Sequence, residues 1–245
     1  MSKQFHFSRE GNTAMPEALK PPYLSKCEDA GGHQVFIVDG SYIRGHIDEE
    51  FTNFGQHYRY HYIPKNELWI DQEGDSNERK FFIEHLLVEH RLMEKGASYG
   101  KALAEADRTE RKERRRAGDV RKLTHNGKKL PEGKDVHERL WKKLENGISI
   151  WIVSGRLVRS VFDIDFTAGG HDYVYEFVPD KEVWIDDDIE EFERGYVLLH
   201  ELHERKRMAD GIPYQKAHAE SSRLEYHCRR HPDELHGALA AEGWA

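Results

Sequence analysis

The chain has 245 residues, of which 38% are hydrophobic and 33% charged, and its formal net charge is −8. This length suits one large domain or two small ones, and the aromatic content argues against wholesale disorder. No apolar run approaches the roughly 18 residues that a membrane helix needs, and the polar start of the sequence lacks the apolar core of a signal peptide. With only two cysteines, a disulfide framework is excluded, and we expect a cytoplasmic protein with no membrane partner.

An internal duplication organises the sequence. A shift of 115 positions aligns residues 16–114 with residues 131–229 without a gap, and roughly a third of the aligned positions are identical. We therefore expect two tandem copies at residues 1–116 and 131–245, which we call the first and second repeats, joined by a linker at residues 117–130. The polar tail after His231 is expected to be frayed.

The two repeats predict the same elements in the same order. In the first repeat, Val35–Arg44 is a β-rich run, and Tyr58–Ile63 alternates aromatic or apolar with polar residues, as a half-buried strand does. A turn then leads to a short strand ending in Trp-Ile-Asp, and two helices follow at about 78–95 and 99–116. The equivalent segments of the second repeat are Ile150–Arg159, Tyr173–Val178, 193–209 and 214–230. The sequence thus predicts an α+β protein of two pseudo-symmetric copies, each a small antiparallel sheet with a helical pair against it.

The first predicted helix of each repeat carries the strongest functional signal. In the second repeat, His200 and Glu204 lie one turn apart within an otherwise apolar stripe. A buried carboxylate needs a cation, a donor or another partner, and a divalent metal would satisfy both groups at once. The second helix adds Glu225 and His218, which lie two turns apart on one face. The equivalents in the first repeat are His85, Glu89 and Glu110.

The second repeat reads His-Glu-Leu-His-Glu at residues 200–204, with Glu225 about two dozen residues later. This resembles the active-site helix of the zincin metalloproteases, in particular the gluzincin branch, which uses His-Glu-x-x-His and a downstream Glu. The resemblance implies a zincin-like fold, with His200 as first metal ligand, Glu201 as general base and Glu225 as third ligand. It covers about 35 residues and is degenerate, since Glu204 replaces the second histidine of the motif. Zn²⁺ is the expected metal, and because two acids and one histidine make a harder site, Mn²⁺ or Fe²⁺ are alternatives.

The first repeat lacks two of these groups. Leu86 stands where the second repeat has Glu201, and Leu103 stands where it has His218. A reaction that needs a base beside the first ligand cannot proceed there, so we expect the first repeat to be a degenerate, scaffolding copy. The structural alternative is that the shared His/Glu/Glu set is a polar network in both repeats and that Glu201 is a solvated helix residue.

These patterns favour a metal-dependent hydrolase, peptidase-like, that acts on a peptide or protein substrate through the second repeat. Arg159 and Tyr214 are substrate-binding candidates, although an ion pair with a shared acid is the alternative for Arg159. The run 186–188 of three aspartates could bind a cation or cap a helix. A non-catalytic, two-lobed binding or structural protein is the alternative function. Nucleic-acid binding through the basic residues 108–129 is a third option, disfavoured by the acidic remainder of the chain.

Overall fold

The computed structural model describes residues 19–118 and 131–244, which form two compact units. Of the described residues, the first unit comprises 19–42 together with 51–116, and the second comprises 43–50 together with 117–118 and 131–244. The units thus follow the two repeats, except that residues 43–50 of the first repeat belong to the second unit. The expected α+β fold of two similar halves is confirmed. Most of the predicted linker, residues 119–130, lies outside the described residues.

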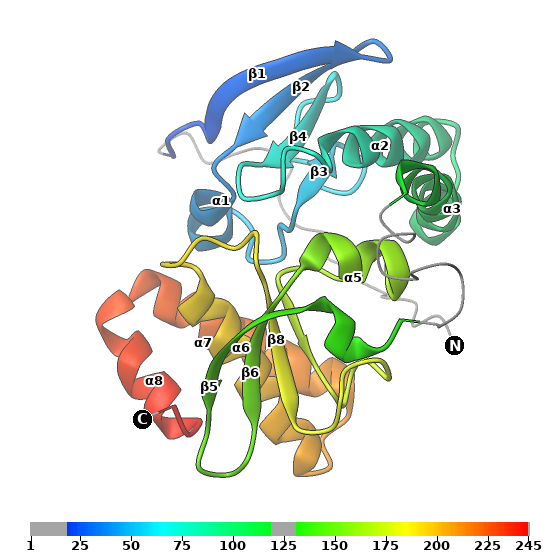
Figure 1. The fold of residues 1–245 in the computed structure, drawn as a ribbon. Helices are drawn as coiled ribbons and strands as arrows, with labels where there is room; N and C mark the ends of the chain where they lie inside the picture. Colours follow the sequence, from blue (N-terminus) through cyan, green and yellow to red (C-terminus); the bar gives the residue numbers. More distant parts are fainter. Residues whose placement is uncertain (1–18, 119–130, 245) are drawn as a thin grey trace. The chain divides into compact units, whose positions relative to one another are not determined.

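The first unit is built on a four-stranded sheet in the order β1-β2-β4-β3 (Figure 1). Its strands are β1 (Tyr23–Ala30), β2 (His33–Val38), β3 (Phe54–Gln56) and β4 (Glu67–Asp71). Its helices are α2 (Arg79–Glu94) and α3 (Tyr99–Ala117), and the boundary between the units falls within α1 (Gly40–His46). The helices α2 and α3 match the predicted helical pair to within a few residues.

The second unit repeats this plan with the sheet order β5-β6-β8-β7. Its strands are β5 (His137–Lys143), β6 (Ser149–Val153), β7 (Gly169–His171) and β8 (Glu182–Asp186). Its helices are η2 (Gly133–Val136), α5 (Gly155–Val161), α6 (Arg194–Ala209), α7 (Tyr214–Arg230), η3 (Pro232–Glu234) and α8 (Leu235–Ala241). Here too the two long helices fall where the sequence places them.

Both sheets are mixed, which corrects the expectation of antiparallel sheets. The central pair is parallel in each unit, with Val35 opposite Leu68 and, at the positions 115 residues later, Ile150 opposite Val183. The outer pairs are antiparallel. The parallel pair arises because α1 or α5 and a three-residue edge strand separate the two central strands, and a connection of this length returns the chain in the same direction.

Alternation along the central strands divides the apolar side chains between the two faces of each sheet. In the second unit, Val183 and Ile185 of β8 join the main core beneath α6. Trp184, between them, packs on the opposite face with Val158 of α5 and Phe166. The sheet is therefore buried on both faces, and the α6 face is the one that carries the polar cluster described below.

In both repeats one predicted strand is absent and another is shorter than predicted. Residues 58–63 form consecutive turns, in which the backbone N–H of Tyr60 donates to the carbonyl of Gln56 and that of Ile63 to Tyr60. Their alternation reflects aromatic side chains that reach the core from turns. The predicted strand Val35–Arg44 ends early because Asp39 caps α1, with its carboxylate accepting the backbone N–H of Tyr42 at 2.9 Å.

The C-terminal tail is ordered, in contrast to the expectation that it frays. Leu239 of α8 is 7% exposed and belongs to the main core of the second unit. The ring of Trp244 meets that of Trp141 on β5, with centroids 5.0 Å apart. Among the described residues, no helix combines the length and the apolar character needed to cross a membrane.

Candidate metal centre

Two helices of the second unit bring the sequence-predicted ligands together. His200 and Glu204 lie one turn apart on α6. Gly211, just past the end of α6, has φ +84°, and this left-handed residue ends the helix so that the short connection can return the chain as α7. His218 and Glu225 of α7 then face the α6 pair.

Three donor atoms converge in what we call the donor triangle, formed by His200 Nε2, His218 Nδ1 and Glu204 Oε2. The two nitrogens are 3.1 Å apart, and Glu204 Oε2 lies 2.8 Å from His218 Nδ1 and 3.6 Å from His200 Nε2. Bonds of about 2.0–2.1 Å in a tetrahedral zinc site place neighbouring ligand atoms about 3.3 Å apart. The edges of the donor triangle therefore bracket the spacing of three ligands on one metal ion.

Protonation of the two histidines does not satisfy all three groups of the donor triangle. Burial lowers the pKa of His200, but its hydrogen bonds to Glu204 and Glu225 outweigh that effect and raise the pKa well above its usual value. For His218, burial is likewise outweighed by the acids Glu204 and Glu50, which raise its pKa to about 9. Yet the facing nitrogens of the two rings cannot both hold a proton at 3.1 Å without direct repulsion. One divalent cation would replace both protons and satisfy the carboxylate.

The remote nitrogen of His200 is held by a chain of ion pairs. Its Nδ1 lies 2.9 Å from Glu225 Oε2, so Glu225 sits behind the ring and away from the donor triangle. Arg229 donates to Glu225 Oε1 at 2.9 Å and to Glu193 at 2.8 Å. A carboxylate that accepts the second N–H of a histidine fixes the ring and its tautomer, which is how metal-bound histidines are usually oriented. The geometry thus gives Glu225 the place of an orienting group behind His200.

His171 of β7 is a site residue that the sequence reasoning missed. It is fully buried, its Nδ1 accepts the backbone N–H of Tyr173 at 3.2 Å, and its Nε2 lies 3.0 Å from Glu204 Oε1. Because Nδ1 accepts, Nε2 carries the proton and donates to Glu204, so His171 holds the carboxylate in place. The first repeat has Gln56 at the equivalent position, whose Nε2 donates to Glu89 Oε1 at 2.6 Å. The alignment of His171 with Gln56, two side chains that can both donate a hydrogen bond to the helix glutamate, is the sequence signal that could have identified His171.

Glu201 lies beside the donor triangle. Burial raises its pKa to about 7, with the positive charge of His200 opposing the shift and the negative charge of Glu204 adding to it. The backbone of β7 approaches closely, since a Cβ at Gly169 would lie 3.0 Å from the Cγ of Glu201. Glu201 is therefore packed into the site, which disfavours the interpretation of a solvated helix residue.

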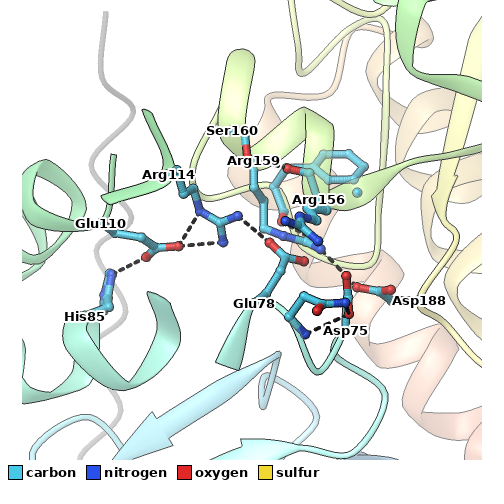
Figure 2. A network of polar contacts seen from close by, with 12 residues as sticks. Asp75, Glu78, His85, Glu110, Arg114, Arg156, Arg159, Ser160 and Asp188 are labelled. Atoms are coloured by element: carbon cyan, nitrogen blue, oxygen red, sulfur yellow. Dashed lines mark hydrogen bonds and ion pairs between the residues drawn. The ribbon is translucent and has the colours of Figure 1, made fainter. Parts of the chain in front are cut away.

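The first repeat uses the same helical positions to hold a histidine between acids, and Figure 2 shows His85 with one of them, Glu110. His85 Nδ1 is 2.8 Å from Glu110 Oε2, and its Nε2 is 3.7 Å from Glu89 Oε2. Glu110 also accepts from Arg114, whose far side pairs with Glu78. Burial opposes the charge on His85, but the hydrogen bonds to Glu110 and Glu89 prevail and raise its pKa to about 10. We therefore expect the His85 ring to be protonated at neutral pH, so that it adds its positive charge to that of Arg114.

Apolar side chains occupy positions of the first repeat where the second repeat has glycine or polar residues. Phe54 stands at the position of Gly169, and its ring centroid lies 5.0 Å from that of His85. Leu86 and Leu103 stand at the positions of Glu201 and His218. Within the described residues, the three groups of side chains that could hold a metal all belong to the second repeat. The first repeat therefore lacks the third candidate ligand, and an aromatic ring stands beside its histidine.

The two predicted substrate-binding residues differ in their surroundings. Tyr214 stacks on His218 with ring centroids 5.5 Å apart, at the edge of the donor triangle, and burial raises its pKa. Arg159 is 3% exposed and pairs with Asp186 and, at 3.1 Å, with Asp188. The ion-pair alternative thus describes Arg159, and the same contacts account for two of the three aspartates at 186–188.

Three of the six cations in the described part of the basic stretch pair with acids. Arg116 lies 2.6 Å from Glu113, Arg108 pairs with Glu105, and Arg114 is fully buried. The rest of the stretch, residues 119–129, lies outside the described residues. Arg111, Lys112 and Arg115 are exposed, so the described part of the stretch keeps positive charge at its surface.

Comparisons of the chain with protein-family models, curated proteins and solved structures gave no match. The resemblance to the zincin helix therefore rests on the residues of this chain.

Proposed function

We propose that the second repeat binds one divalent metal ion through His200, His218 and Glu204 and acts as a metal-dependent hydrolase. The observation that carries this proposal is the donor triangle, whose three edges suit one metal ion. Two nitrogens and one carboxylate form a ligand set found on zinc in peptidases, and Fe²⁺ is also held by such sets. Zn²⁺ is our first choice, and Mn²⁺ or Fe²⁺ are alternatives.

Glu201 is the general base of this proposal. A bound divalent metal lowers the pKa of a water molecule and polarises a carbonyl oxygen. Glu201 is not one of the three proposed ligands, and burial raises its pKa to about 7, so its half-buried carboxylate would accept the proton of the attacking water and return it to the leaving amine. His171 and Glu225 keep Glu204 and His200 in place, and Tyr214 borders the space beside His218. A peptide or protein in the cytoplasm is the proposed substrate.

Metal content tests the binding step. Protein purified without a histidine tag should contain about one equivalent of metal, and removal of that metal should lower the melting temperature. The variant His218→Leu installs the residue of the first repeat and should abolish binding. The matched variant Leu103→His in the first repeat should create no second site, because Phe54 and Leu86 still close it. Wild-type protein that stays metal-free and whose melting temperature ignores added Zn²⁺, Mn²⁺ and Fe²⁺ would refute the proposal.

Hydrolysis of a fluorogenic peptide library tests the catalytic step. Glu201→Gln should retain the metal but lower kcat by about 10²–10⁴-fold, the usual contribution of a general base. Unchanged hydrolysis in this variant would remove Glu201 from the mechanism. A protein that binds metal but cleaves no peptide would instead support the two-lobed, non-catalytic alternative.

A further inference from the structure

A short segment of the first repeat belongs to the unit that contains the donor triangle. Residues 43–50 cluster with the second unit, although the sequence on both sides of them belongs to the first. The segment begins in the last turns of α1 and ends just before Phe51. We therefore asked which residues of the second unit it contacts.

One contact of this segment reaches the group behind His200. Arg44 is 8% exposed, and its Nη2 lies 3.1 Å from Glu193 Oε2. Glu193 also accepts from Arg229, which in turn holds Glu225 against His200 Nδ1. Arg44 thus adds a second cation to the buried carboxylate at the start of this chain of ion pairs.

A second contact reaches the other histidine. Glu50 Oε2 lies 3.8 Å from His218 Nε2, the nitrogen that points away from the donor triangle. The backbone N–H of Glu50 donates to Asp48 Oδ1 at 3.0 Å, which fixes the end of the segment. Glu50 therefore lies at ion-pair distance from the ring nitrogen of His218 that does not face the donor triangle, whereas Glu225 lies within hydrogen-bond distance of the corresponding nitrogen of His200. When that nitrogen keeps its proton, Nδ1 presents its lone pair to the site.

We infer that Glu50 is a positioning residue of the metal site, supplied to the second repeat by the first. This inference rests on the proposed function, because it assigns Glu50 to the same site. Because Glu50 comes from the first repeat, an isolated copy of the second repeat would not contain it. The duplication would then have made the metal site dependent on both halves of the sequence.

Titration of the metal-free, full-length protein with Co²⁺ tests this role, because Co²⁺ reports its ligands through its visible absorption. Glu50→Ala should weaken Co²⁺ binding about 10–100-fold, the usual effect of removing an outer partner of a ligand. Glu50→Gln keeps an acceptor oxygen without the charge and should fall between Glu50→Ala and wild type. Asp165→Ala removes the equivalent acid of the second repeat and should leave the affinity unchanged.

Two further readouts separate positioning from folding. The metal-free melting temperature of Glu50→Ala should stay close to that of wild type, and nitrogen NMR should show His218 losing its single protonated Nε2 tautomer. If Glu50→Ala binds Co²⁺ within twofold of wild type, the inference is overturned while the proposed function stands. If wild-type protein binds no Co²⁺, the proposed function itself fails, and the role of Glu50 fails with it.

Discussion

The protonated histidine of the first repeat makes a quantitative prediction about alkaline stability. The pKa of His85 is raised from 6.5 to about 10 in the folded protein, where Glu110 and Glu89 flank the ring. A base whose pKa is higher in the folded state binds protons more tightly there, so its contribution is complete below pH 6.5 and disappears as the pH rises through 10. At 1.36 kcal/mol per pKa unit, the full contribution is about 5 kcal/mol, of which about 4 kcal/mol is present at pH 7.

Urea unfolding at several pH values between 7 and 10.5 measures this loss. The free energy of unfolding of the wild-type protein should fall by about 4 kcal/mol over that range. His85→Gln, which cannot titrate there, should be less stable at pH 7 and should show a flatter alkaline limb, so the difference between the two curves isolates His85 from lysine and tyrosine residues. NMR of the His85 ring gives an independent reading of its protonation. A ring that titrates near pH 6.5, or parallel alkaline limbs in the two proteins, would refute the reasoning.

Two further predictions concern packing and acid stability. Gly155→Ala should lower the free energy of unfolding by about 2–4 kcal/mol, because its Cβ would overlap the carboxylate of Asp186. The control Gly147→Ala is opposed only by its φ of +86° and should lower the free energy of unfolding by about 1 kcal/mol in the same urea assay. Similar losses in the two variants would contradict the overlap. Burial lowers the pKa of His90, so the folded state resists its protonation and stability should fall as the pH drops below 6.5. The double variant His57→Asp/His90→Arg copies the ion pair that Asp172 and Arg205 form in the second repeat, and it should flatten this acid limb. An unchanged limb would count against the argument.

The long helices and the strands that precede them were predictable because their signals are local. The repeated Trp-Ile-Asp strand ends and the stripe around His200 fall on elements that the structure confirms. The parallel central pair was not predictable from the same runs, because strand direction depends on how the chain crosses between strands. The turns at 58–63 were misread because aromatic residues at alternate positions can reach a core from turns as well as from a strand.

The candidate site was predictable in part for the same reason. Helical spacing places His200 above Glu204, and an antiparallel partner helix brings His218 to them, so these three residues could be grouped before any coordinates. His171 lies on a strand of three residues, too short to show a period. Glu50 reaches the site through the assignment of one short segment to the other unit, which no pattern within a repeat encodes.

The polar cluster around His85 and the polar cluster around His200 share the same backbone elements and differ in a few side chains. The ligand-bearing backbone comes from helices and strands common to both, so its geometry does not depend on loops that would have to be rebuilt. The metal site of the second repeat could therefore be built in the first repeat by substitution. The quadruple replacement would exchange Phe54, Gln56, Leu86 and Leu103 for their counterparts 115 residues later. Metal binding by the substituted first repeat would then show whether these four side chains, added to the shared histidine and glutamate, are enough to make a metal site.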